Sequence, residues 1–109
     1  MIEKCYAYKR TEEKAIEKIV DLDNVAINHM VLPPGERLPR HESNSNVYMI
    51  VVTGAVTLGL GRQQPHRYGE GSIVEIPMGV TMDVLNEDDA VLEFFVVKAP
   101  GPRSFVGKK

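Results

Sequence analysis

The chain has a single cysteine, no tryptophan and only 6% aromatic residues among its 109 positions. Because Cys5 stands alone, it cannot form an intrachain disulfide, which suits a reducing compartment. No apolar run approaches the roughly 18–20 residues that a membrane-spanning helix needs. The first residues, Met1 to Lys4, lack the apolar core of a signal peptide. We therefore expect a cytoplasmic protein with no membrane partner.

An excess of basic charge is also missing, since 13 basic residues face 15 acidic ones and the formal net charge is −2. This balance offers no field that would hold nucleic acid or an anionic membrane surface. No helix-turn-helix segment accompanies the predicted strands, which also disfavours a DNA-binding regulator. The 43% hydrophobic and 26% charged residues are ordinary globular values and exclude disorder. At this length we expect one domain over residues 1–109 with a single core.

The sequence is rich in β-branched residues and in residues that form turns. Fourteen Val and seven Ile stand beside nine Gly and seven Pro, and the short apolar runs stop at Gly, Pro or Asn. We expect strands over residues 25–32, 47–52, 55–60, 72–76, 80–85 and 90–97. With no long helical period, this spacing favours an all-β sandwich or small barrel.

Both ends of the chain are harder to interpret. Residues 12–21 place four apolar side chains at helical spacing behind Thr11, a residue suited to capping a helix. The same stretch also fits an exposed edge strand, so residues 11–21 stay open between a short N-terminal helix and a strand. At the other end we expect a loose tail over residues 100–109, from which Phe105 and Val106 can dock elsewhere.

Two segments share a paired pattern of turn residues at fixed spacing. The first, residues 34–54, reads Pro34-Gly35, five residues, His41-Glu42-Ser43, three residues, Val47, six residues, Gly54. The second, residues 71–86, reads Gly71, five residues, Pro77-Met78-Gly79, two residues, Met82, three residues, Asn86. This pattern resembles the two motifs of the cupin superfamily and implies a single jelly-roll barrel, also called a double-stranded β-helix. Gly54 and Gly71 are then expected to adopt a positive φ, which a Cβ would penalise.

The resemblance also identifies the positions at which most cupins hold a divalent metal. Two His and a Glu of the first motif and a His of the second correspond here to His41, Ser43, Val47 and Met82. Zinc, iron or manganese needs three or more converging imidazole or carboxylate groups, and only His41 supplies one. We therefore expect a degenerate metal site and no metal cofactor. A copper(I) site of His41, Met49 and Met82 is chemically conceivable, since copper(I) accepts thioethers.

The same positions predict a pocket inside the barrel. If Val47 and Met82 point inward, alternation also turns Met49 and Val51 inward on one strand, and Val80 and Val84 on the other. His41 and Ser43 would then form a polar corner of an apolar cavity, with His41 deep in the barrel, where a polar group needs a partner. The predicted ligand-binding residues are His41, Ser43, Val47, Met49 and Met82. The Met and Val side chains can also simply fill a small barrel.

Two classes of function fit this pocket. In the first, the protein binds an unidentified small molecule as a sensor, a carrier or an accessory to an enzyme. In the second, it resembles metal-independent cupin isomerases and epimerases, with His41 as general base and Glu93 or Asp83 as the carboxylate that orients it. The lost ligands argue against a third class, metal-dependent dioxygenases and isomerases. We favour the binding protein and assign no catalytic residue.

The remaining expectations concern the other histidines and the assembly. A lone strand histidine such as His29 is expected to be satisfied locally, and His66 to be exposed. An apolar N-terminal strand over residues 5–8 would have little to bury against in a small monomer, and unpaired edges attract partners. We therefore expect a homodimer with an isologous interface.

Overall fold

The computed structural model describes residues 2–105 of the chain, and this part is almost entirely β-structure. Its elements are β1 (Ala15–Asp21), β2 (Ala26–Leu32), β3 (His41–Glu42), β4 (Val47–Thr53), β5 (Ala55–Leu60), β6 (His66–Gly69), β7 (Ile73–Ile76), β8 (Thr81–Leu85), β9 (Leu92–Lys98) and the 3-10 helix η1 (Pro102–Phe105). Among the described residues, no helix has the length and apolar character that crossing a membrane requires. The all-β prediction is confirmed.

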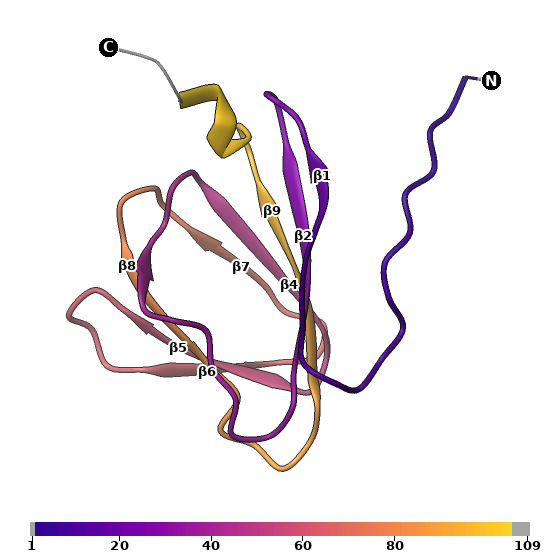
Figure 1. Ribbon diagram of the computed structural model, residues 1–109. Coiled ribbons are helices and arrows are strands. Elements are labelled where there is room, and N and C mark those ends of the chain that lie inside the picture. Colours follow the sequence, from indigo (N-terminus) through magenta and orange to yellow (C-terminus); the bar gives the residue numbers. More distant parts are fainter. Residues whose placement is uncertain (1, 106–109) are drawn as a thin grey trace.

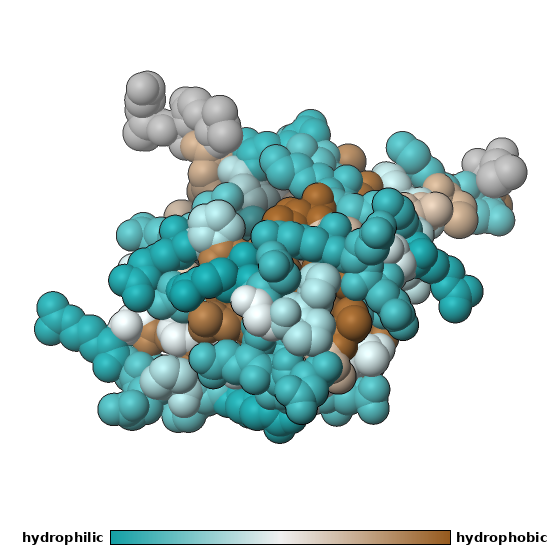
Figure 2. Space-filling model, turned by 60° about the horizontal axis from the view of Figure 1, so that its bottom comes forward, coloured by the Kyte–Doolittle hydropathy of each residue, from teal (hydrophilic) through white to brown (hydrophobic). Residues whose placement is uncertain are grey.

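The strands form two antiparallel sheets that face each other as a jelly roll (Figure 1). The larger sheet has the order β1-β2-β9-β4-β7 and the smaller one the order β3-β8-β5-β6. The face presented in Figure 2 is mostly hydrophilic, with hydrophobic residues visible only in small areas between polar side chains. Fourteen buried apolar side chains form one core cluster, as the burial of apolar surface demands.

Side chains alternate between the core and the outside along the strands that carry the motif positions. On β4, Val47, Met49 and Val51 are buried, while the residues between them are only half-buried. On β8, Met82 and Val84 are buried in the same core. The predicted inward alternation is confirmed. Gly54 and Gly71 also have the expected positive φ, at 80° and 89°.

Residues 15–21 form the edge strand β1, so the alternative of a short N-terminal helix is wrong. The strand pairs antiparallel with β2, and its register shifts between Lys18 and Val20. A bulge of this kind places two residues opposite one and interrupts the strict period of two. This interruption is why the apolar spacing of the segment also fitted a helix.

The predicted strand over residues 5–8 is also wrong, because the segment before β1 makes no strand pairing in the described structure. In Figure 1 it lies on the side of β1 and β2 and leads away from the two sheets toward the N-terminus. Two other contacts hold it: the Tyr8 ring lies 4.5 Å from that of His29, and the Lys9 backbone amide donates to a Glu17 carboxylate oxygen at 3.1 Å. The segment is held at Tyr8 and Lys9 rather than through a backbone ladder.

The C-terminal segment is not a loose tail up to residue 105. Gly101 is buried, and its amide donates to the Asp23 carbonyl at 3.0 Å. In η1, Arg103 pairs with the Asp23 carboxylate at 2.8 Å, which fastens the segment to the β1–β2 turn. Phe105 is partly exposed, and Val106 lies outside the described residues.

Candidate functional site

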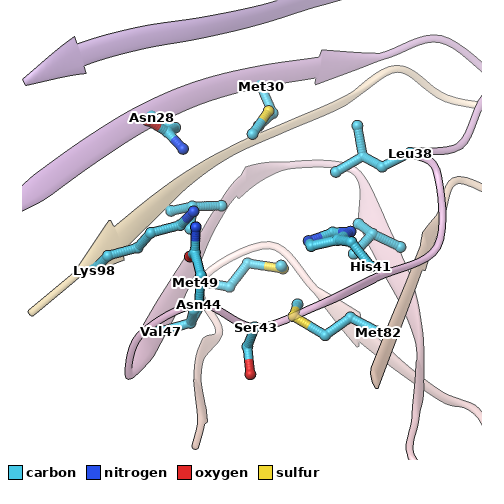
Figure 3. A pocket seen from close by; sticks show the side chains of 12 residues that line it. Asn28, Met30, Leu38, His41, Ser43, Asn44, Val47, Met49, Met82 and Lys98 are labelled. Atoms are coloured by element: carbon cyan, nitrogen blue, oxygen red, sulfur yellow. The ribbon is translucent and has the colours of Figure 1, made fainter. Parts of the chain in front are cut away.

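A cavity of about 40 Å³ lies between the inner faces of the two sheets, and all five predicted site residues line it. Val47 and Met49 come from β4, Met82 from β8, His41 from β3, and Ser43 from the loop that follows β3. Figure 3 shows these side chains around one space. By the usual measure the cavity has room for about three water-sized groups. The motif spacing thus brought together residues that converge in space.

Three methionines form part of the apolar wall of the cavity. Met30 on β2 joins Met49 and Met82, and all three are buried in the core. Met30 was not among the predicted site residues, although it lies two residues before Leu32 on the same inward face of its strand. Flexible, polarizable thioether side chains adapt to ligands of irregular shape.

His41 is exposed, so its expected position deep in the barrel is wrong. Its Nδ1–H donates to the Pro39 carbonyl at 2.8 Å, which fixes the tautomer of a neutral ring. The Nε2 atom then carries the free lone pair and can accept a hydrogen bond. His41 therefore lines the cavity as an exposed residue and is not a buried group that needs a partner.

Ser43 does not supply the expected polar corner, because its hydroxyl is occupied elsewhere. The Oγ donates to the Pro77 carbonyl at 2.7 Å and accepts from the Val80 amide at 2.9 Å. In Figure 3 the hydroxyl points away from the other labelled side chains of the cavity. Ser43 fastens the loop after β3 to the turn before β8, and only the rest of the residue lines the cavity.

The polar groups of the cavity come from residues that the motif did not mark. Asn28 on β2, Asn44 and Lys98 at the end of β9 line the cavity, and Figure 3 shows them together on one side of it. Lys98 is half-buried, and within residues 2–105 no carboxylate lies at ion-pair distance from it. Burial, and secondarily the charge of Lys18, lower the pKa of Lys98.

Neither carboxylate proposed to orient His41 is available. Glu93 Oε2 lies 2.7 Å from His29 Nε2, and His29 points to the outer face of the larger sheet. Asp83 is bound by Arg40 at 2.7 Å, and this partner is the main reason that the pKa of Asp83 is lowered. Neither Glu93 nor Asp83 can therefore orient His41 as a general base.

The predictions for the other two histidines are confirmed. His29 is hydrogen-bonded to neighbouring side chains, and His66 is exposed.

The four positions that correspond to metal ligands do not fit a divalent ion. Val47 has no donor atom, the Ser43 hydroxyl is occupied, and His41 is the single imidazole at the cavity. In the part of the chain that the structure describes, no group of three or more His, Cys, Asp or Glu residues is placed to hold a metal. The methionine thioethers and His41 line the same cavity, and copper(I) accepts donors of this kind.

A family model of the cupin domain matches residues 28–98, which include both motifs and the cavity. The chain belongs to the cupin family. This cupin is 51% identical over 104 residues to an uncharacterized protein of Methanocaldococcus jannaschii, MJ0764, with 94% of this chain and 90% of that protein covered. The crystal structure of MJ0764, described as an RmlC-like cupin family protein with a double-stranded β-helix fold, superposes with a TM-score of 0.93 at 50% identity, covering 96% of this chain and 97% of that one.

More distant structures support the fold alone. An uncharacterized conserved protein with a double-stranded β-helix domain from Klebsiella pneumoniae has a TM-score of 0.75 at 18% identity. The match covers 88% of this cupin and 84% of that chain. The resemblance inferred from the two motifs and the jelly-roll architecture are confirmed.

Proposed function

We propose that this cupin binds a small organic molecule in the cavity between its sheets without the help of a metal. The main support for the proposal is that apolar side chains occupy positions at which most cupins have metal ligands. Val47 and Met82 make these positions part of the apolar wall. The His41 Nε2 atom and the Lys98 ammonium are polar groups at the cavity, and within residues 2–105 neither has a hydrogen-bond or ion-pair partner. An apolar hollow with a few convergent polar groups is the usual form of a small-molecule site.

The enzyme alternative is less well supported by the same geometry. A metal-independent isomerase needs an acid–base group held in position, and His41 has a backbone carbonyl rather than a carboxylate behind its ring. We therefore propose a sensor, carrier or accessory protein, whose ligand is bound and released unchanged.

The methionines provide a direct test of binding. In protein with isotope-labelled methionine methyl groups, a panel of alcohols, amides, amines and carboxylic acids of up to about six carbons should include members that shift the Met30, Met49 and Met82 signals. Met78 serves as an internal control, because it is 49% exposed and lies outside the cavity. If no member of the panel moves the three cavity signals, the proposal is wrong.

A pair of variants on β4 locates the binding. Val47→Phe should fill the cavity and abolish the shifts, since the larger side chain takes the space of the ligand. Val52→Phe is the matched control, because Val52 lies on the same strand and is 41% exposed. Binding that survives Val47→Phe would place the ligand somewhere else.

We also propose that two copies of this cupin associate through the segment before β1. Ile2, Tyr6 and Tyr8 in this segment are exposed apolar side chains that a second copy would cover. Light scattering at micromolar concentration should give a dimer. A mass near 12.2 kDa would contradict this expectation.

A further inference from the structure

The polar side of the cavity shares its lining with a second hollow of about 170 Å³. Asn28, Asn44 and Lys98 line both spaces, and Lys18 and Arg103 line the outer one. A polar group of a molecule at this side of the inner cavity would therefore meet residues that also line the outer hollow.

The outer hollow carries uncompensated positive charge. Lys18 faces Asn28 directly in the β1–β2 register, and its charge acts on Lys98. Arg103 is neutralised by Asp23, and its other contact is the Asp21 carbonyl at 2.6 Å. Among residues 2–105, Asp21 is the one acidic side chain that lines the hollow, and it stands against the two lysines. Half-burying a cation without a counter-ion is unfavourable, so an anion at this place gains a partner already in position.

Asn28 supplies a second polar group aimed into the same space. The residue is only 9% exposed, and its amide makes no hydrogen bond to another described residue. Within residues 2–105, every buried side-chain nitrogen or oxygen that solvent cannot reach has a hydrogen-bond partner. Because the Asn28 amide has no such partner, it must be accessible, and it lines the cavity. Its NH₂ group can donate to a ligand oxygen, as can the Lys98 ammonium.

We propose that the ligand of this cupin is a short-chain carboxylic acid, with its carboxylate bound by Lys98 and Asn28 and its aliphatic part against the cavity methionines. The proposal rests on the proposed function and adds the chemical class of the ligand. The inner cavity has room for about three water-sized groups, which sets the length of the aliphatic part and makes butyrate a suitable probe. A charge-assisted hydrogen bond favours a carboxylate over a neutral oxygen at this position.

The test compares three probes of equal length: butyrate, butyramide and 1-butylamine, titrated against the labelled methionine signals. Butyrate should bind at least about tenfold more tightly than butyramide, and the amine should not bind, because Lys18 and Lys98 repel it. Lys98→Met should remove the preference for the acid. Lys14→Met is the matched control, since Lys14 is exposed and pairs with Glu36 at 3.0 Å away from the cavity.

The pH dependence of the native protein provides a second measurement that needs no variant. Because a bound carboxylate stabilises the charged ammonium, butyrate binding should take up protons and weaken as alkaline pH deprotonates Lys98. Butyramide binding should not weaken in the same way. Equal affinity for acid and amide, with no pH effect, would overturn the acid assignment and leave the proposed function intact. Failure of all three probes and of the wider panel would overturn both.

Discussion

Gly54→Ala should destabilise this cupin far more than Gly71→Ala, although both glycines have nearly the same positive φ, 80° and 89°. A Cβ at residue 71 would meet nothing within 4 Å, so that variant carries only backbone strain, about 1–2 kcal/mol. A Cβ at residue 54 would overlap the Val91 carbonyl oxygen and lie 3.1 Å from the Leu92 Cα. These atoms are backbone at the start of β9 and cannot move aside as a side chain would.

The expected loss for Gly54→Ala is about 4 kcal/mol or more, which is a large part of the stability of a domain this size. Urea unfolding of both variants, followed by circular dichroism, measures the two losses under the same conditions. Gly71→Ala serves as the control for strain alone. Equal losses would mean that the approach of the Gly54 turn to β9 has no energetic consequence.

His29→Leu should produce the second large loss of stability, about 2–3 kcal/mol, because it breaks a buried cluster on the outer face of the larger sheet. Both ring nitrogens of His29 lie 2.7 Å from a carboxylate oxygen, one of Glu17 and one of Glu93. The ring is fully buried between Tyr8 and Phe95. The expected loss of stability is smaller than for a fully buried ion pair, because both carboxylates are partly exposed.

The same cluster predicts how the loss depends on pH. The hydrogen bond from His29, followed by that from the Lys9 amide, lowers the pKa of Glu17. A lowered carboxyl pKa contributes stability that is present above the ordinary value and is lost as the pH falls through the lowered one. The difference between the native protein and His29→Leu should therefore shrink in acid. His66→Leu, at an exposed position, is the control. A His29→Leu loss that stays constant into acid would contradict this role of Glu17.

The framework of the fold was predictable because its determinants are local. Alternating apolar residues and the turn glycines located the long strands and their inward faces, including Val47, Met49 and Met82. The short strands β3 and β6 were not predicted. They have only two and four residues, are largely exposed or half-buried, and are held by pairing with β8 and β5 rather than by an apolar pattern of their own.

The spacing of the motif residues predicted several side chains that line the candidate site, but it did not predict their hydrogen bonds. Motif spacing placed His41, Val47 and Met82 at one cavity, and strand alternation added Met49. The bonds of the Ser43 hydroxyl depend on a turn more than 30 residues away. Lys98 was missed because the predicted strand ended at residue 97, one residue short of β9. Extending the alternation from Val96 by one step would have turned Lys98 inward.

Binding without a metal is the central claim, and one titration tests it most directly. The dissociation constant for butyrate is measured before and after dialysis against EDTA together with a copper(I) chelator, and the metal content is determined in the same samples. We expect well under one equivalent of any transition metal and a dissociation constant that changes by less than about twofold. Binding that is lost on chelation and restored by a metal would contradict the claim, and restoration by copper(I) would assign the site to His41 and the methionines.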